Sequence, residues 1–264
     1  MSERRTALIT GASSGFGVEF AKLFARDGFD VVLVARTEPP MQQLAEQLRA
    51  EHAITATVIA KDLSTYGASD ELAADLAARG IQVDALVNNA GFAQYGPFVD
   101  ADAGDLHQMV AVNVVALTAL TRSLLPGMVE RGWGRIVNLG SIGSFTAAPM
   151  TGAYAATKAY VLSLSLALTE ELAGTGVTVT ALCPGPTGTG FQARAEMADS
   201  KLIAGRDLDS AEAVARAGYA AMKKGRPYLV TGTTSKLFAF GSRFLPRTMS
   251  AKIAGRAQQK VPGA

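Results

Sequence analysis

The chain has 264 residues, of which 48% are hydrophobic and 18% charged, and its formal net charge of +2 comes from scattered basic residues. This composition suits one folded α/β domain and argues against a disordered chain or a nucleic-acid-binding protein. The single Cys183 excludes an internal disulfide, and His52 and His107 lack the spacing of a metal site.

Short β-branched runs alternate with longer stretches of helical periodicity, a pattern that is typical of βαβ units. We expect strands at residues 6–10, 30–35, 54–60, 83–88, 134–140, 177–183 and 227–231, and helices at residues 15–27, 40–52, 66–79, 105–131, 152–173 and 210–224. The strands are almost continuously apolar, which indicates a sheet that is covered on both faces. The sequence therefore predicts one α/β domain over residues 1–264, with a Rossmann fold and a doubly wound, seven-stranded parallel sheet flanked by helices.

Two stretches lie outside this alternation. Residues 184–209 are irregular and follow the sixth strand, beyond whose carboxyl end ligands bind in such sheets, so we expect a substrate loop there. Residues 232–264 mix phenylalanines with lysines and arginines. We expect a helical extension that closes the substrate side or packs on a neighbouring subunit, and an amphipathic element at a membrane surface is the alternative.

The chain begins Met-Ser-Glu-Arg-Arg and then enters the first strand, and it has no window of about 18 uninterrupted apolar residues. We therefore expect a cytoplasmic protein without a signal peptide or a membrane-spanning segment.

A glycine-rich turn joins the first strand to the first helix. It comprises Thr10, Gly11, Ala12, Ser13, Ser14, Gly15, Phe16 and Gly17. Glycines let the backbone approach a pyrophosphate closely, and the free N–H groups at the helix start face the anion. The position of this turn in the first βαβ unit favours nucleotide binding over a turn that binds nothing.

The second strand ends at Arg36, where NAD enzymes usually carry a carboxylate that holds the ribose 2′-hydroxyl. A guanidinium can instead bind the 2′-phosphate of NADP with a planar pair of donors. The alternatives are a surface arginine that pairs with Glu38, or Glu38 itself in the NAD role. We predict a preference for NADP(H), with NAD(H) as the second choice.

Further motifs follow the later strands. They are Asp62 and Leu63 after the third strand, Asn89, Ala90 and Gly91 after the fourth, Asn113 in the long helix, Ser141 after the fifth, then Tyr154 and Lys158, and Pro184 and Gly185 after the sixth. The ordered set TGxxxGxG, NNAG, YxxxK and PG resembles the short-chain dehydrogenase/reductase family over roughly residues 6–190. This resemblance implies hydride transfer between a nicotinamide cofactor and a carbonyl or alcohol.

Tyr154 and Lys158 are one helical turn apart, so the ammonium can favour the phenolate. The resemblance implies that Tyr154 is the general acid/base and that Lys158 also holds the nicotinamide ribose. It implies that Ser141 binds the substrate oxygen and that Asn113 bends its helix and holds a water that links Lys158 to solvent. Each residue alone also fits packing, a turn cap or a satisfied buried amide, but the joint occurrence favours catalysis.

The resemblance also implies the other cofactor contacts. Asp62 and Leu63 border the adenine, Asn89 to Gly91 line the adenosine ribose, and the Pro184-Gly185 turn shapes the nicotinamide pocket. The family commonly has PGxVxT, whereas Thr187 takes the valine position here and Gly188 follows it. We expect the Thr187 N–H to bind the carboxamide, and Thr189 to bind the carboxamide or a phosphate.

The residues expected to face the substrate are mostly apolar or aromatic and include no Arg or Lys. They are Phe92, Gln94, Tyr95, Ile142, Phe145, Met150, Pro186, Phe191 and Met197. We therefore expect a hydrophobic ketone, aldehyde or secondary alcohol as substrate, although several of these residues also fit a core role.

The long helices at residues 105–131 and 152–173 carry small and aliphatic residues on more than one face, including Leu162 and Leu166. The resemblance implies that they pair across a twofold axis in a homodimer or homotetramer. Two other function classes stay open: a non-redox isomerase or epimerase on the same fold, and a nucleotide-sensing binding protein. The joint presence of the four expected catalytic residues argues against a pure sensor.

Overall fold

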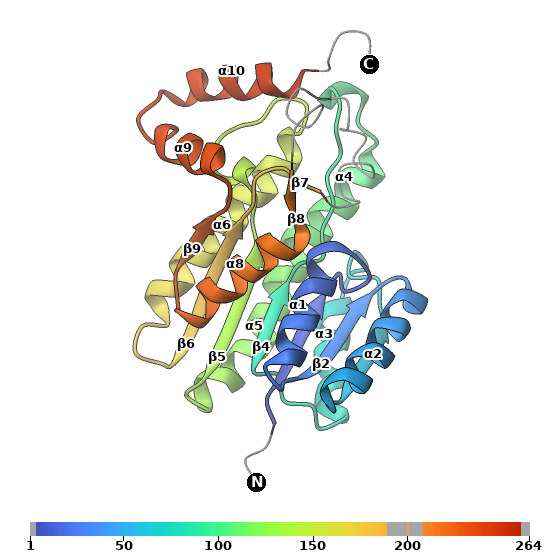
Figure 1. Ribbon diagram of the computed structural model, residues 1–264. Coiled ribbons are helices and arrows are strands. Elements are labelled where there is room, and N and C mark those ends of the chain that lie inside the picture. Colours follow the sequence, from blue (N-terminus) through green and yellow to red (C-terminus); the bar gives the residue numbers. More distant parts are fainter. Residues whose placement is uncertain (1–3, 189–199, 201–207, 260–264) are drawn as a thin grey trace.

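A parallel sheet forms the centre of the computed structural model, which describes residues 4–188, 200 and 208–259 (Figure 1). Its strands are β1 (Thr6–Thr10), β2 (Asp30–Ala35), β3 (Ala56–Ala60), β4 (Ala85–Asn88), β5 (Gly134–Leu139), β6 (Val177–Cys183) and β9 (Tyr228–Val230). They lie in the order β3-β2-β1-β4-β5-β6-β9. The direction of winding reverses between β1 and β4, which is where ligands bind in doubly wound sheets. The predicted fold class is confirmed.

Helices cover both faces of the sheet (Figure 1). One face carries α1 (Gly15–Arg26), α2 (Glu38–His52) and α8 (Ala211–Lys223), and the other carries α3 (Ala68–Ala78), α5 (Leu117–Glu130) and α6 (Gly152–Glu171). Successive strand residues alternate between the two cores: Ile9 packs under the first set of helices and Leu8 under the second. This double burial explains why the strands are apolar at almost every position. Every predicted strand and helix is found within two residues of its predicted bounds.

The predicted long helix is a composite of α4 (Ala103–Val110), the π-helical segment η2 (Ala111–Ala116) and α5. By length and composition alone, Ala103–Glu130 is one helix that could cross a membrane. The core helix of a soluble protein meets the same criteria, and this helix packs against α3, β5 and α6. The composite helix is therefore only weak support for a membrane span.

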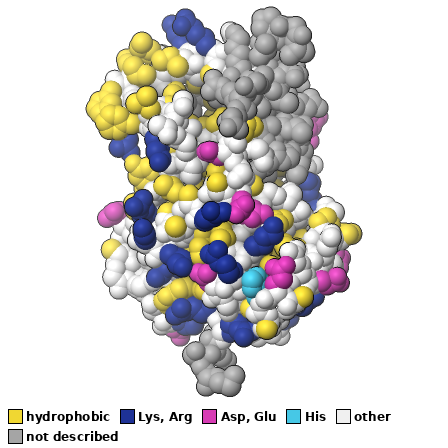
Figure 2. All heavy atoms as spheres, viewed as in Figure 1, with side chains coloured by type: hydrophobic (Ala, Val, Ile, Leu, Met, Phe, Trp, Pro, Cys, Tyr) yellow, Lys and Arg dark blue, Asp and Glu magenta, His cyan; other side chains and the backbone are white. Residues whose placement is uncertain are grey.

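The end of the chain adds α9 (Thr233–Gly241) and α10 (Arg247–Gln258), which lie above the carboxyl edge of the sheet (Figure 1). A hydrogen bond of 2.7 Å between the hydroxyls of Thr146 and Ser250 ties α10 to the loop after β5. Large apolar side chains of this region, among them Phe240 and Phe244, are exposed. Figure 2 shows hydrophobic side chains gathered on the upper part of this face, with Lys and Arg side chains nearby.

The stretch after β6 is less irregular than the sequence indicates. Strands β7 (Thr187–Gly188) and β8 (Asp209–Ser210) pair in parallel and join its two ends. Residues 189–199 and 201–207, between these strands, lie outside the described part of the chain.

Candidate functional site

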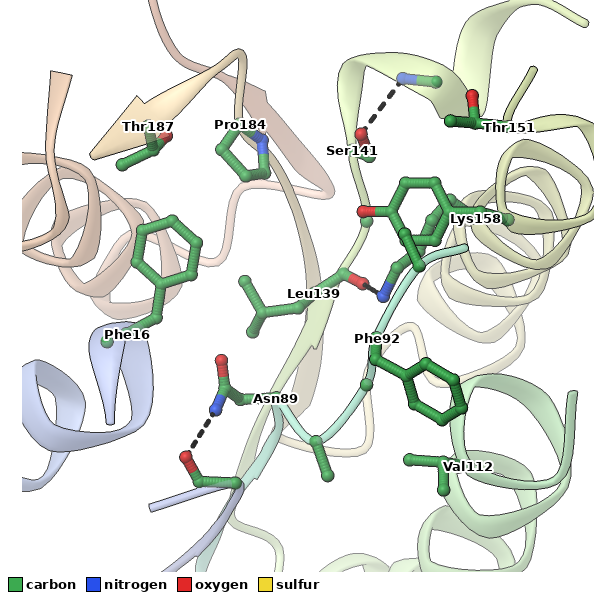
Figure 3. A pocket seen from close by; sticks show the side chains of 18 of the residues that line it. Phe16, Asn89, Phe92, Val112, Leu139, Ser141, Thr151, Lys158, Pro184 and Thr187 are labelled. Atoms are coloured by element: carbon green, nitrogen blue, oxygen red, sulfur yellow. Dashed lines mark hydrogen bonds between the residues drawn. The ribbon is translucent and has the colours of Figure 1, made fainter. Parts of the chain in front are cut away.

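A cavity of about 810 Å³ opens at the carboxyl edge of the sheet (Figure 3). Its walls come from the turns that follow β1 to β6, from α6, and from α9 and α10. The cavity therefore lies at the winding reversal, and segments far apart in the sequence meet around it.

The glycine turn after β1 has a backbone geometry and a close packing that favour glycine. Gly11 and Gly15 have φ angles of 65° and 56°, in the left-handed region. A Cβ atom on Gly11 would lie 2.7 Å from Asn89 Nδ2, and one on Gly17 would lie 2.3 Å from the carbonyl oxygen of Gly11. Ser13, Ser14, Gly15 and Phe16 line the cavity beside Gly11, whereas Gly17 is buried behind the turn. Gly17 thus permits the packing of α1 against the turn instead of lining the cavity.

The first turn of α1 presents free N–H groups to this cavity. Ser14 is the N-cap, yet its side chain accepts no cap hydrogen bond, and the first turn contains no acidic residue. The N–H groups at a helix start carry a partial positive charge and bind phosphate where a side chain does not cap them. The turn and helix start therefore fit a nucleotide pyrophosphate.

Thr10 and Asn89 fasten the first and fourth strand ends together. The N–H groups of Asn89 and Ala90 both donate to Thr10 Oγ1 at 3.0 Å, and Asn89 Nδ2 donates to the carbonyl oxygen of Thr10 at 2.8 Å. Asn89, Ala90 and Gly91 line the cavity. The sequence reading assigned no role to Thr10, although its place at the head of the glycine motif was the available signal.

Arg36 and Asp62 flank the cavity at the ends of β2 and β3. Arg36 is exposed and makes no hydrogen bond or ion pair within the described part of the chain, while Glu38 accepts a hydrogen bond from Gln42. The predicted alternative of an Arg36–Glu38 pair is therefore not present. Burial acts to raise the pKa of Asp62, but hydrogen bonds from Ser64 and the charge of Arg36 lower it. Leu63 lines the cavity beside Asp62.

Asn113 lies in the π-helical segment η2, which agrees with the expected distortion of its helix. It is buried, and its side chain donates to the carbonyl oxygen of Phe92 at 3.0 Å and to Thr157 Oγ1 at 3.1 Å. The Phe92 N–H donates back to Asn113 Oδ1. Asn113 therefore joins the turn after β4 to α6, one residue before Lys158.

Tyr154, Lys158 and Ser141 all line the cavity, and Figure 3 shows Ser141 and Lys158 beside it. The Tyr154 hydroxyl is hydrogen-bonded to the side chain of Ser141. Ser141 Oγ also accepts from the Gly143 N–H at 3.1 Å, which fixes its position. Lys158 Nζ donates to the carbonyl oxygen of Leu139 at 2.6 Å and lies 5.7 Å from the centre of the Tyr154 ring.

The electrostatics of this group differ from the simple expectation drawn from residue spacing. Burial lowers the pKa of Lys158 to about 8 and raises the pKa of Tyr154 to about 12, even though the Ser141 hydrogen bond acts in the opposite direction on Tyr154. For Tyr154, desolvation by the protein thus outweighs the hydrogen bond from Ser141. At neutral pH Lys158 is charged and Tyr154 holds its proton, which is the protonation state that a proton donor needs.

Cys183 ends β6 directly beneath this group and is fully buried. Burial raises the pKa of its thiol to about 12, and hydrogen bonds with Ser144 and the Ser141 backbone only partly oppose this. The thiol therefore stays protonated and unreactive.

The Pro184-Gly185 turn lines the cavity next to Ser141, and the Pro184 carbonyl oxygen accepts from the Ile142 N–H at 2.8 Å. Thr187 also lines the cavity, and its hydroxyl donates to the Gly185 carbonyl oxygen at 2.9 Å. Thr189 lies outside the described residues.

The residues predicted to face the substrate divide into several groups. Phe92, Ile142 and Pro186 line the main cavity, whereas Gln94, Tyr95 and Met150 line a second cavity of about 310 Å³. Phe145 packs in the core near Tyr228, and Phe191 and Met197 lie outside the described residues. The hydrogen bond from the Gly96 N–H to the Met150 carbonyl oxygen joins the two loops around the second cavity.

The sequence predicted a helical extension that closes the substrate side or packs on a neighbouring subunit, but it did not identify which residues of this extension line the main cavity. The lining residues from α9 and α10 are Thr234, Ser235, Phe238, Ile253, Ala254, Ala257 and Gln258. The mixed composition of this region favoured a cover over the substrate side without indicating which of its residues point inward.

The fold and this cavity define a dinucleotide-binding protein of the Rossmann class. A family model described as short chain dehydrogenase matches residues 5–199. The chain therefore belongs to the short-chain dehydrogenase family of oxidoreductases.

Three similar proteins place it within this family. The chain is 38% identical over 182 residues to the NADP-dependent 3-hydroxy acid dehydrogenase YdfG of Salmonella typhimurium, covering 69% of this chain and 72% of that protein. A short-chain dehydrogenase from Sphingobium yanoikuyae in complex with NADPH has 30% identity and a TM-score of 0.80, covering 98% of this chain and all of that one. The bulky-bulky ketone specific alcohol dehydrogenase from Comamonas testosteroni has 31% identity and a TM-score of 0.77, covering 91% and 92% of the two chains.

The chain covers a smaller share of some other relatives. The chain spans 59% and 63% of the length of the first two curated relatives that it matches.

Proposed function

We propose that this protein is an NADP(H)-dependent oxidoreductase that interconverts a hydrophobic ketone or aldehyde and the corresponding alcohol. The observation that carries the proposal is the convergence of Ser141, Tyr154 and Lys158 on the cavity that the glycine turn also lines. A binding protein without turnover has no need of a buried phenol and ammonium at its nucleotide site.

The glycine turn and the start of α1 would hold the nucleotide, with Asp62, Leu63 and Asn89 to Gly91 beside its adenosine half and Pro184, Gly185 and Thr187 beside its nicotinamide; all of these residues line the cavity. Bound NADPH supplies the hydride. Ser141 then donates a hydrogen bond to the substrate carbonyl oxygen, and Tyr154 delivers its proton to that oxygen as negative charge develops. Lys158 stabilises the resulting phenolate and binds the nicotinamide ribose, while Asn113 positions α6 and connects Lys158 to a proton relay.

The preference for NADP(H) rests on Arg36, whose guanidinium is exposed at the cavity and is free of the neighbouring Glu38. The NADPH complex of the Sphingobium relative supports this choice. We expect Arg36→Ala to lower the ratio of kcat/KM for NADPH to that for NADH by at least tenfold, because a charge-assisted bidentate pair with the 2′-phosphate is lost. Arg216→Ala, on the surface of α8, is the matched control. An unchanged ratio in Arg36→Ala, or an equal preference for NADH in the wild type, would refute this assignment.

The hydrophobic substrate class rests on the cavity walls beyond the reacting group, which include Phe92, Val112, Ile142 and Phe238. The bulky-ketone specificity in the name of the Comamonas relative supports this class, whereas the name of YdfG points to a hydroxy acid. The cationic side chains that line the described cavity are Arg36, Lys61 and Lys158. The first two lie at the ends of β2 and β3, on the nucleotide side, so they leave the distal walls without a partner for a carboxylate.

A panel of aliphatic and aromatic ketones, aldehydes and short oxo acids, monitored by loss of NADPH absorbance, tests the proposal. We expect turnover of the apolar carbonyls, loss of at least 1,000-fold in Tyr154→Phe, and little change in Tyr160→Phe, whose side chain lies on the same helix but outside the cavity lining. Nucleotide binding without any turnover would favour a sensor, and conversion of substrate without net NADPH loss would favour an isomerase or epimerase. A strong preference for oxo acids would contradict the substrate class.

The oligomeric state and location complete the proposal. Val115 on η2 and Tyr160 and Leu166 on α6 leave apolar surface exposed, and pairing of these helices between two subunits would cover it. We propose a homodimer or homotetramer in the cytoplasm. Light scattering that gives a monomer at micromolar concentration would exclude the oligomer.

A further inference from the structure

The two helices at the end of the chain, α9 and α10, each turn one side toward the protein and the other side outward. In α9 the residues Ser235 and Ala239 are buried, and in α10 the residues Ser250 and Ala254 are buried. Positions four residues apart lie on the same side of a helix, so these residues mark the inward sides. The outward sides of the two helices and the turn between them are called here the α9–α10 surface.

Large apolar side chains are exposed on the α9–α10 surface. The exposed fractions are 72% for Leu237, 61% for Phe240, 74% for Phe244, 50% for Met249 and 39% for Ile253. The rings of Phe240 and Phe244 pack edge to face with their centroids 5.2 Å apart, so these two residues form one continuous apolar group. Figure 2 shows hydrophobic side chains gathered on the upper part of the face it presents. Exposed apolar groups of this kind mark an interaction surface rather than an ordinary solvated one.

The charge of the same surface has one sign. The exposed charged residues of α9, α10 and the turn between them are Lys236, Arg243, Arg247, Lys252 and Arg256. None of the five forms an ion pair within the described part of the chain. The sequence contains no Asp or Glu after Glu212. Asp209, beside Gly232 at the start of α9, is one negative charge against these five positive ones.

An anionic lipid surface complements both features of the α9–α10 surface. Lipid phosphates attract the lysines and arginines, while the boundary between headgroups and acyl chains accepts the phenylalanines and aliphatic side chains. A second copy of the chain is a poorer partner, because a twofold contact would place the same basic surface on both sides. With 9 and 12 residues, α9 and α10 are too short to span a bilayer, which takes about 20 residues. The contact is therefore peripheral.

We propose that the α9–α10 surface binds this protein peripherally to membranes that contain anionic lipids. The Phe240 and Phe244 rings enter the interfacial layer, and the five basic side chains lie against the lipid phosphates. This inference goes beyond the proposed oxidoreductase function and does not depend on it, since membrane binding needs neither nucleotide nor turnover.

Co-sedimentation with lipid vesicles tests the proposal on the full chain. The probes are vesicles of phosphatidylcholine alone and vesicles that also contain about 30% phosphatidylglycerol. We expect wild-type protein to bind the anionic vesicles at least tenfold more tightly than the neutral ones. An increase in ionic strength from about 0.1 M to about 0.5 M should weaken the binding severalfold, because salt screens the exposed charges.

A first pair of variants tests the apolar part of the surface. Phe240→Ser combined with Phe244→Ser should weaken binding to anionic vesicles by about tenfold or more, because the insertion of two aromatic side chains is lost. Tyr66→Ser is the matched control, since Tyr66 is 99% exposed but follows β3, at the opposite side of the sheet from β9 and α9. This control should bind as the wild type does.

A second pair of variants tests the basic part. Lys236→Gln combined with Arg247→Gln should weaken binding to anionic vesicles by about tenfold or more, since each basic group near such a surface contributes about fivefold. Lys224→Gln combined with Arg226→Gln removes the same charge from exposed residues before the amino end of β9, at the opposite edge of the sheet. This control should change binding less than twofold.

The controls for folding and assembly use the same proteins without lipid. All of the altered side chains are exposed, and circular dichroism and thermal unfolding should match those of the wild type. Absence of binding to anionic vesicles, equal binding to neutral vesicles, or undiminished binding of the Phe240 and Phe244 double variant would overturn the proposal. A lower mass of that variant in light scattering would assign the surface to a second copy of the chain and would overturn it as well.

Discussion

Replacement of Lys158 by methionine tests the electrostatic core of the proposed mechanism. Lys158 Nζ lies 5.7 Å from the centre of the Tyr154 ring. At an effective dielectric constant of about 20, two unit charges about this far apart attract by about 3 kcal/mol, or about two pKa units, and we expect an effect of this size on the Tyr154 phenolate. Burial lowers the pKa of Lys158 to about 8, so this charge is present at pH 7. Its loss should therefore be fully expressed between pH 6 and 7.5.

The assay is the pH dependence of kcat/KM for alcohol oxidation, which requires the Tyr154 phenolate as base. In Lys158→Met we expect the acidic limb to move to higher pH by about two units and the rate at pH 7 to fall about 100-fold. Lys158→Arg, which keeps the charge, should leave the limb within half a unit of the wild type even if its rate is lower. Nucleotide affinity is measured separately by fluorescence titration, because Lys158 is also proposed to bind the ribose. A Lys158→Met limb that coincides with that of the wild type would refute the electrostatic role.

Three further predictions concern packing, protonation and assembly. Gly17→Ala places a Cβ atom 2.3 Å from the Gly11 carbonyl oxygen. Urea denaturation should therefore show a free energy of unfolding lower by about 1–3 kcal/mol, and nucleotide binding should be weaker. As the control, Gly241→Ala on α9, where a Cβ meets nothing within 4 Å, should leave stability unchanged or slightly raised. Because the pKa of Lys158 is lowered from 10.5 to about 8, the unfolded chain binds more protons between these values, and Lys158 makes stability rise with pH there. Lys158→Met lacks this rise, so its stability relative to the wild type should fall between pH 7.5 and 10; a constant difference would contradict the burial of a charged Lys158. Leu166→Glu, which puts a charge on the exposed face of α6, should lower the mass measured by light scattering to that of a monomer, whereas Leu237→Glu on α9 should not.

The sequence was sufficient to predict the sheet, its flanking helices and most of the residues that line the cavity around the glycine turn. These predictions depend on local signals. The strands follow from their apolar runs, and the site follows from the glycine spacing after β1 and from the one-turn separation of Tyr154 from Lys158. Parallel strands bring their carboxyl ends to one edge, so residues placed after successive strands are expected to meet without knowledge of the loops.

The substrate end could not be predicted in the same way, because it depends on how loops cross one another. Phe92 and Tyr95 are three residues apart in one loop, yet Phe92 lines the main cavity and Tyr95 the second. Periodicity assigns faces within a helix or strand and has no meaning in such a loop. The pKa of Tyr154 illustrates a further limit. The sequence shows a lysine one helical turn away, but the desolvation that raises the pKa of Tyr154 arises only when α6 packs over β5 and β6.

The difference between the nucleotide side and the substrate side of the cavity also limits what the relatives indicate about the substrate. The family match ends at residue 199, whereas part of the cavity wall comes from residues 234 to 258. The shared segment contains the glycine turn, Ser141, Tyr154 and Lys158, to which we assign the roles common to any carbonyl substrate, whereas the cavity-lining residues of α9 and α10 lie outside it. Exchange of residues 232–264 for the corresponding segment of the Comamonas testosteroni alcohol dehydrogenase should therefore change the order of preference among ketones and leave the NADPH-to-NADH ratio unchanged. A chimera with altered nucleotide preference and the original order of ketones would show that the two ends are not separable in this way.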